Sequence, residues 1–544
     1  MFNDQNESTL TKIIFAGDAR RKLFKGMEIA AAAVGCTLGP KGKTVLIQRK
    51  GESPLVTKDG VTVSKSIKLR DPVMKMGADL IREAASQTNE VAGDGTTTAT
   101  VLTHAMVKEG LKLLEAGYSA QELCHDIEST TELIVSKIRE TAKQLTTSEE
   151  VAQVGTISAN GDEKIGQLIA QAMDKVGKDG IITVEDAKGM STSLDVVEGM
   201  AFDRGYISPY FVTNADRMQV VYQDPYVLVT DKKLSSLRDL IPILEKVVQS
   251  HQSLFIIAED VDGEALQGLV LNKVKSGLPV VAIKAPGYGQ HREELLNDIC
   301  TLTGGKLISS STGISLEKVT LQDLGRLKKV VVDAKSSTLV GSGATKAAVE
   351  AHVSALRTQL EDVTLSAEGI TKLKMRIAKL AGGVAIIRVG GVTEVEMVER
   401  KYRIEDALNA TRAATEEGIV PGGGMALLNA AFDVSAKQVK PFGMGGNVVL
   451  LACEAPLRRI VSNAGESDAV VLSNLRSHKA MADIQHHGYD AANAKEVDMF
   501  HEGIIDPVKV TITALKNAAS VAITFLLLDA VIVEDEDVKH NEVT

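Results

Sequence analysis

A single acid, Asp94, stands between two glycines in the segment EVAGDGTTTATV (residues 90–101), and three threonines follow it. The apolar residues after the threonines predict that a helix begins there. A helix N-terminus presents unpaired N–H groups and favours anions such as phosphate. A carboxylate would repel phosphate unless a cation lay between them, and Mg²⁺ binds one or two carboxylates together with phosphate oxygens. We interpret the segment as a Mg²⁺–nucleotide cradle; the alternative is a ligand-free helix N-cap, which is common for Asp and Thr.

Three further segments carry glycines and charged residues in turns. CTLGPKGKT (36–44) resembles a phosphate-binding P-loop, but only two residues separate Gly39 from Gly42 where that motif needs four, so it is excluded. VTKDGVTVSK (56–65) supplies Lys58 and Asp59, and IVPGGGMALL (419–428) places three glycines before a further expected helix. No G-x-G-x-x-G follows an expected strand in the middle of the chain. The sequence therefore predicts a nucleotide site outside the standard loops.

The bulk composition limits the classes of protein to which the chain can belong. Its 544 residues predict roughly three or four domains. The net charge of −10 disfavours a nucleic-acid partner. Four scattered cysteines without a CxxC pair favour a reducing compartment over a zinc site or a disulfide framework. We see no signal peptide and no membrane-spanning run, so we expect no membrane partner and a cytoplasmic location.

The hydrophobic rhythm divides the chain into three regions. The first 140 residues are expected to be mostly helical. In the middle, short β-branched runs at 226–230, 254–258, 279–284 and 306–309 alternate with helix-period segments, which predicts a parallel sheet with crossover helices. Residues 393–417 contain neither Gly nor Pro and predict one long helix. Helices are expected to dominate the remainder, up to a closing strand at AVIV.

Ten motifs in collinear order give the chain a specific family resemblance. They are TLGPKGKTV, TKDGVTV, AGDGTTTATV, FDRGYISPYF, IAEDVDGEAL, KAPGYG, LAGGVAI, EDALNATRAA, VPGGGMAL and IDPVKVT. Together they resemble the bacterial-type group I chaperonins, the GroEL kind, from about Phe15 to Val533. The resemblance implies a multi-domain subunit of the α+β class in which helices predominate. Its equatorial domain would span 1–140 with 417–544, its intermediate domain 141–197 with 385–416, and its α/β apical domain 198–384.

The same resemblance assigns a nucleotide site and an ATPase activity. Asp94 would hold Mg²⁺, and a potassium ion is implied near Thr37, Lys58 and Thr97. Asp406 matches the acid that positions the attacking water, and Asp59 matches a second acid supporting hydrolysis. The residues expected around the phosphates, ribose and base are Thr37, Leu38, Gly39, Pro40, Lys58, Asp94, Gly95, Thr96, Thr97, Thr98, Gly423, Asp490, Ala491, Ala492 and Asp506.

The expected helices at 237–248 and 264–274 carry continuous apolar stripes. On base rates, such stripes cover a sheet and belong to the core. The resemblance implies instead that part of this surface faces a central cavity and binds unfolded polypeptides, and that ATP binding then offers it to a lid-like co-chaperonin. The residues implied are Tyr206, Tyr210, Phe211, Ile241, Leu244, Leu266, Val270 and Leu271. The subunit would assemble into homo-oligomeric rings of seven members, single or double.

The chain departs from the family pattern at three places. An acidic segment replaces the usual Gly-Gly-Met tail, and Asp490 stands where Asn is usual, although a carboxylate cannot donate to a base as an amide does. Ser467 stands where Glu commonly pairs across two rings with an arginine, here Arg458, which suggests a less secure double ring. The alternative functions are an ATP-independent holdase or ring scaffold and, more distantly, a metabolic ATP-dependent enzyme.

Overall fold

The computed structural model describes residues 11–49, 54–159, 161–177, 181–187, 189–197, 199–215, 217–309, 315–341, 343–360, 367–381, 383–436, 443–481 and 486–534. The chain divides into two compact units. The first comprises Met1–Gln171, Lys188–Ser191 and Val389–Thr544, and the second comprises Ala172–Ala187 and Thr192–Arg388. The acidic tail at 535–544 lies outside the described residues. The division into equatorial, intermediate and apical domains stays a prediction.

The first unit is mainly helical. Its helices are α1 (Ala16–Gly35), α2 (Gly60–Ser66), α3 (Pro72–Ala92), α4 (Thr96–Glu115), α5 (Ala120–Glu140), α6 (Ser148–Ser158), most of α7 (Glu163–Val176), α13 (Glu394–Glu417), α14 (Met425–Ala436), α15 (Met444–Ala452), α16 (Ala455–Asn463), α17 (Asp468–Met481) and α18 (Val508–Leu526). Antiparallel strand pairs join β1 (Thr11–Phe15) to β22 (Ala530–Glu534), β2 (Val45–Ile47) to β3 (Leu55–Thr57), β18 (Ile419–Pro421) to β21 (Ile505–Pro507), and β19 (His487–Asp490) to β20 (Lys495–Asp498).

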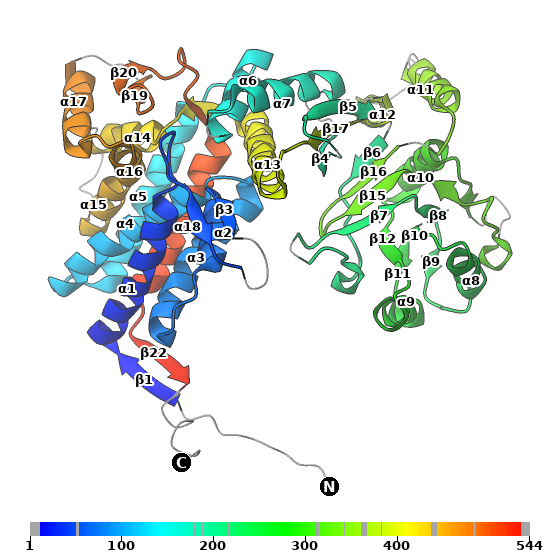
Figure 1. The fold of residues 1–544 in the computed structure, drawn as a ribbon, viewed down its shortest axis with the longest axis horizontal. Coiled ribbons are helices and arrows are strands. Elements are labelled where there is room, and N and C mark those ends of the chain that lie inside the picture. Colours follow the sequence, from blue (N-terminus) through cyan, green and yellow to red (C-terminus); the bar gives the residue numbers. More distant parts are fainter. Residues whose placement is uncertain are drawn as a thin grey trace, which may run out of the picture. The chain divides into compact units, whose positions relative to one another are not determined.

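Helix α18 forms the centre of this unit and contacts α3, α4 and α5 (Figure 1). Its apolar residues, among them Leu515 and Phe525, are fully buried, and each such side chain stabilises the fold by about 1.5–3 kcal/mol. Helices α1 and α3 approach closely because glycines face the partner backbone. A Cβ on Gly26 would lie 1.8 Å from the Met74 carbonyl oxygen, and one on Gly77 would lie 1.9 Å from that of Leu23. The helical packing around α18 holds α4, whose N-terminus carries the threonines.

The second unit combines sheets and covering helices. Its helices are α8 (Ile241–Gln249), α9 (Gly263–Ser276), α10 (Gly289–Thr303), α11 (Lys346–Leu360) and α12 (Ala367–Ala381), with 3₁₀ turns η1 (Pro209–Phe211) and η2 (Leu316–Lys318). Its strands are β4 (Ile181–Asp186), β5 (Ser193–Val197), β6 (Gly199–Phe202), β7 (Val220–Gln223), β8 (Tyr226–Thr230), β9 (Lys233–Leu234), β10 (Leu254–Ala258), β11 (Asp260–Val261), β12 (Val280–Lys284), β13 (Leu307–Ile308), β14 (Gly325–Arg326), β15 (Lys329–Val332), β16 (Ser337–Val340) and β17 (Val384–Val389).

The parallel sheet expected in the middle of the chain is present. Strands β12, β10, β8 and β13 pair in parallel in that order, and β14 adds to β8 antiparallel (Figure 1). A four-stranded antiparallel sheet, β6-β16-β15-β7, a three-stranded sheet, β4-β17-β5, and a parallel pair of short strands, β9 and β11, complete the unit. Strand β10 is buried along its whole length, as expected for a parallel strand covered on both faces.

Two expected helices can be compared with the observed elements. The long helix at 393–417 is confirmed as α13, whose N-cap Thr393 accepts a hydrogen bond from the Glu396 amide. The helical stripe expected from Leu237 is wrong at its start, because α8 begins only at Ile241. Pro242 lies in the first turn of α8, where its missing N–H costs nothing, whereas deeper in a helix it would break the hydrogen-bond ladder.

Candidate functional site

One cavity of about 410 Å³ in the first unit gathers the residues expected around a nucleotide. Its lining comes from segments spread over most of the chain. The expected residues that line it are Thr37, Leu38, Gly39, Pro40, Lys58, Asp59, Asp94, Gly95, Thr96, Thr97, Thr98, Asp406, Gly423, Asp490, Ala491, Ala492 and Asp506. All the residues assigned to nucleotide contacts or catalysis therefore lie together; their roles stay predictions.

Asp94 occupies the turn between α3 and α4. Gly93 ends α3 with φ 72° and Gly95 is the N-cap of α4 with φ 83°, both in the left-handed region that favours glycine. Asp94 is therefore not the N-cap of α4, because Gly95 occupies the N-cap position and no side chain caps the helix there. The Asp94 carboxylate instead accepts from the Gly95 amide at 2.5 Å and from the Ser158 hydroxyl at 2.8 Å.

Asp59 is held at the start of α2, where it accepts hydrogen bonds from the amides of Val61 at 3.0 Å and Thr62 at 2.8 Å. The next residue, Gly60, lies against the threonines of α4. A Cβ on Gly60 would come within 2.4 Å of the Thr97 hydroxyl oxygen. This close approach fixes the start of α2, and with it Asp59, beside the start of α4.

Asp406 lies on α13, and its carboxylate accepts no hydrogen bond from any residue that the structure describes. Burial raises the pKa of Asp406 well above its usual range, and the nearby carboxylates of Asp94 and Asp59 raise it further. Burial also raises the pKa of Asp94. The pairing of β18 with β21 sets Asp506 opposite Val420, where burial and the charge of Asp94 raise its pKa to about 7.

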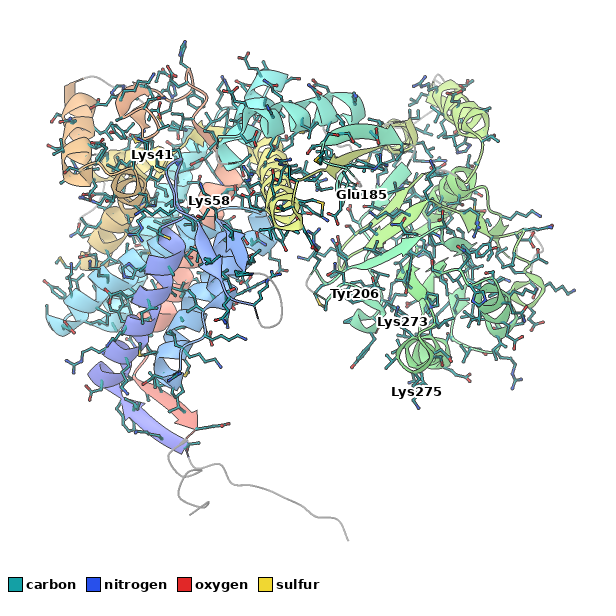
Figure 2. All side chains as sticks on the ribbon, viewed as in Figure 1. Lys41, Lys58, Glu185, Tyr206, Lys273 and Lys275 are labelled. Carbon is teal, nitrogen blue, oxygen red and sulfur yellow. The ribbon has the colours of Figure 1, made fainter. Side chains whose placement is uncertain are left out.

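These acids line one cavity, and the repulsion between their charges is relieved either by protonation or by a cation between them. In the part of the chain that the structure describes, no three His, Cys, Asp or Glu side chains come close enough to hold a metal ion by themselves. The Asp94 carboxylate in this cavity is the kind of ligand that Mg²⁺ takes, since Mg²⁺ binds one or two carboxylates and completes its shell with phosphate oxygens and water. Lys58 also lines the cavity and forms no ion pair with a described residue, so its charge is available to an anion (Figure 2).

The segment expected beside the nucleobase forms a turn after β19. The Asp490 carboxylate accepts from the amides of Ala492 at 2.9 Å and Asn493 at 3.2 Å, and from the Asn493 side-chain amide at 2.7 Å. These bonds use Asp490 to shape the turn. Ala491 and Ala492 reach the cavity through the same turn.

The residues expected to bind unfolded chains divide by exposure in the second unit. Tyr210, Ile241 and Leu271 are 69%, 42% and 52% exposed, while Tyr206, Leu266 and Val270 are half-buried. The expectation is not supported for Phe211 and Leu244, which are 0% and 8% exposed because both pack into the core beneath α8 and η1. Val248 and Val274, taken from the sequence as members of a core stripe, are instead exposed.

Two features near the site were not identified from the sequence. Helix α6 lines the cavity with Val154, Ile157 and Ser158, and no motif in that segment signals the Ser158–Asp94 hydrogen bond. Arg458, considered above only as a partner across rings, pairs within the chain with Glu454 at 2.8 Å and Asp468 at 2.9 Å.

None of the described helices combines enough length with enough apolar character to cross a lipid bilayer.

Known proteins with the same architecture were found by sequence and by structure. The sequence model of the TCP-1/cpn60 chaperonin family matches residues 30–536. The chaperonin gp146 of bacteriophage EL 2 (Pseudomonas aeruginosa), crystallised in the presence of ATP-BeFx, is similar in two crystal forms. Crystal form II has a TM-score of 0.69 and crystal form I a TM-score of 0.63; each is 23% identical and covers 96% of this chain and 99% of its own. This chain belongs to the TCP-1/cpn60 chaperonin family, as a divergent chaperonin of the GroEL type.

Proposed function

We propose that this chaperonin is an ATP-dependent folding machine that binds non-native polypeptides and uses Mg²⁺-dependent ATP hydrolysis to release them. Asp59, Asp94 and Asp406 line one cavity although more than 300 residues of sequence separate the first two from the third, and this convergence carries the proposal. The similar phage chaperonin was crystallised in the presence of an ATP analogue, which supports a nucleotide as the ligand here.

The roles of the acids follow from their partners. Asp94, held by Gly95 and Ser158, is the residue that would hold Mg²⁺, which when bound supplies charge neutralisation for the phosphates. The backbone N–H groups at the start of α4 and the Lys58 ammonium would bind phosphate oxygens. Asp406 accepts no hydrogen bond from a described residue, so its oxygens are available to orient a water molecule and accept its proton. Asp59, fixed at the start of α2, would support that water.

Phosphate release by the purified full-length chain tests the ATPase. We expect Asp406→Ala to retain nucleotide binding and to lower the hydrolysis rate by about a hundredfold or more, as for loss of a general base. Glu417→Ala is the matched control, since Glu417 is another acid of α13 and does not line the cavity. If the wild type releases no phosphate while still suppressing client aggregation, the ATP-independent holdase replaces this proposal.

Comparing K⁺ with Na⁺ in the same assay tests the potassium ion proposed near Thr37, Lys58 and Thr97.

The client-binding surface is proposed on α8, α9 and η1. Ile241, Val248, Leu271 and Val274 expose apolar side chains there, together with Tyr210, and exposed apolar groups mark interaction sites. We expect Val274→Ser to weaken capture of an unfolded client, measured as suppression of its aggregation. The neighbouring Lys275→Ser, which removes an exposed charge, is expected to retain capture. Equal loss in both variants would count against an apolar client surface.

Assembly into a homo-oligomeric ring, proposed to have seven members, follows the family. The internal pairing of Arg458 with Glu454 and Asp468 leaves it less available to a second ring, which supports a weak double ring or a single ring. Electron micrographs recorded with and without ATP test this, and rings that stay back to back throughout would contradict it.

A lid-like co-chaperonin and a cytoplasmic location belong to the same proposal. The four cysteines are all unpaired, which fits a reducing compartment.

A further inference from the structure

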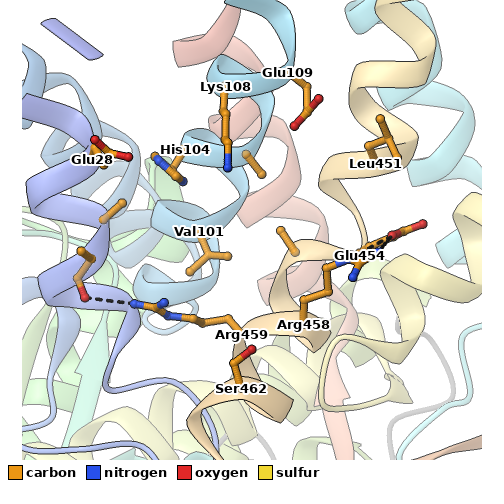
Figure 3. Close-up of a pocket in the computed structure, with 14 residues that line it drawn as sticks. Glu28, Val101, His104, Lys108, Glu109, Leu451, Glu454, Arg458, Arg459 and Ser462 are labelled. Carbon is orange, nitrogen blue, oxygen red and sulfur yellow. Dashed lines mark hydrogen bonds and ion pairs between the residues drawn. The ribbon is translucent and has the colours of Figure 1, made fainter. Parts of the chain in front are cut away.

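A second cavity, of about 610 Å³, lies in the first unit between α1, α4, α15 and α16 (Figure 3). It shares no lining residue with the cavity described above. Its volume falls within the usual range for small-molecule sites, about 300–1,000 Å³. Nothing in the proposed ATPase cycle uses this space.

The floor of the second cavity is apolar and built from small side chains. Ala31 and Ala32 of α1, Val101 and Ala105 of α4, and Ala455 of α16 form it. Alanines on three neighbouring helices leave room between the helices that larger side chains would fill. The floor can therefore take an apolar body.

The wall carries polar nitrogen atoms that lack partners. The Nε atom of Arg459 and the Nε2 atom of His104 are buried and have no hydrogen-bond partner among the described residues, although buried polar atoms are normally satisfied. Arg459 is anchored by its other end, because Nη2 donates to the Ala32 carbonyl oxygen at 3.1 Å. Lys108 extends over the same space (Figure 3) and forms no ion pair or hydrogen bond with a described residue. Three nitrogen-bearing side chains thus share one cavity.

The balance of charge on the wall points to an anion. Glu454 is engaged by Arg458 at 2.8 Å and also by Arg476, and Glu109 is engaged by Lys112 at 2.7 Å. Among the lining residues outside those pairs, Lys108 and Arg459 carry positive charges and Glu28 carries a negative one. The excess is one positive charge, which a monoanion balances.

We propose that this cavity binds a small carboxylate with an apolar body, its carboxylate taken by Lys108, Arg459 and His104 and its body lying on the alanine floor. A free phosphate fits less well, since most of the lining would offer its oxygens no donor. An acidic side chain from a second copy of this chain could satisfy the same donors but would leave much of the floor uncovered.

The probe is 4-bromobenzoate, titrated by calorimetry into the assembled full-length protein without nucleotide and located by the anomalous signal of bromine in crystals. We expect one probe molecule per chain, with bromine over Val101 and Ala105. Lys108→Met should weaken binding by about tenfold to a hundredfold, as for loss of one charge-assisted hydrogen bond, and Ala105→Phe should abolish it by filling the floor.

Lys25→Met is the matched control, because Lys25 is an exposed lysine of α1 that does not line the cavity; we expect it to bind the probe as the wild type does. Lys108 forms no hydrogen bond or ion pair with a described residue that its replacement would break, so its variant should fold normally, which unchanged thermal melting would verify. Three results would each overturn the proposal: bromine bound only elsewhere, for instance on α8 and α9; a neighbouring subunit's side chain filling the cavity; or equal weakening by Lys108→Met and Lys25→Met.

Discussion

Asp506→Asn removes the acid whose pKa the structure raises to about 7, and its effect on stability should depend on pH. Burial and the nearby Asp94 charge cause the rise. An acid whose pKa is higher in the folded state binds a proton more tightly there. Its contribution to stability is complete below the unfolded value of 3.8 and is lost as the pH rises through about 7. The Asn variant has no such loss.

The magnitude follows from the size of the shift. A rise from 3.8 to about 7 corresponds to about 4 kcal/mol at 1.36 kcal/mol per unit. Somewhat more than half of this change falls between pH 5 and pH 8, which is about 2–3 kcal/mol, or about 2–4 °C in melting temperature for a chain of several hundred residues.

The assay is thermal melting of nucleotide-free protein in EDTA at pH 5 and pH 8. We expect the melting temperature of the variant, relative to that of the wild type, to be about 2–4 °C higher at pH 8 than at pH 5. Glu115→Gln, at an exposed position of α4 outside the cavity, is the control and should keep the wild-type pH dependence. In a second arm with Mg²⁺ and ATP, the wild type should gain more stability than the variant, since Asp506 lines the proposed nucleotide cavity. A difference between variant and wild type that is the same at both pH values would refute the reasoning.

Four further outcomes follow from particular contacts. Ser158→Ala removes the donor to Asp94 and should raise the Mg²⁺ concentration needed for half-maximal phosphate release several-fold; an unchanged requirement would show that Ser158 does not orient Asp94. Gly26→Ala should destabilise or prevent folding, because its Cβ would lie 1.8 Å from a carbonyl oxygen. Gly17→Ala on the same helix would meet only the end of the Arg21 side chain, at 3.9 Å, and should be neutral or stabilising in denaturant titrations. Glu150→Gln should lower stability at pH 7 and lose that effect as the pH falls from 4.5 towards 2, because the bond to Lys143 and the amides of Thr146 and Thr147 lower the pKa of Glu150 to about 2; acid titrations that run parallel would contradict this. Asn463 and Arg459 lie on the same helix, α16, and the Asn463 side chain donates to the carbonyl oxygens of Gly35 and Leu38 at 2.9 Å. This contact joins the second cavity, lined by Arg459, to the first, lined by Leu38, so 4-bromobenzoate and nucleotide should change each other's Kd by one common factor. Asn463→Ala should bring that factor towards one.

The local signals in the sequence were sufficient for most elements. The four short β-branched runs became the parallel strands β8, β10, β12 and β13, since hydrophobic period and flanking turns act over a few residues. The unbroken segment at 393–417 became α13 for the same reason. The glycines around Asp94 correctly marked the turn before α4. The chemistry of a nucleotide cradle is a prediction from residue types, because a carboxylate among phosphate-binding groups implies a cation, and it stays a prediction.

Only the tertiary structure decided which surfaces meet. The packing of α6 and α13 brings Ser158 and Asp406 to Asp94, and no local pattern encodes contacts between segments so far apart. Exposure was decided in the same way: Phe211 and Leu244 entered the core while Val248 and Val274 remained outside, because burial depends on which neighbour covers a helix face. The second cavity exists because alanines from α1, α4 and α16 meet, and each alone is an ordinary helix residue. Sequence determines the chemistry that each segment can offer, and long-range packing determines where that chemistry is combined.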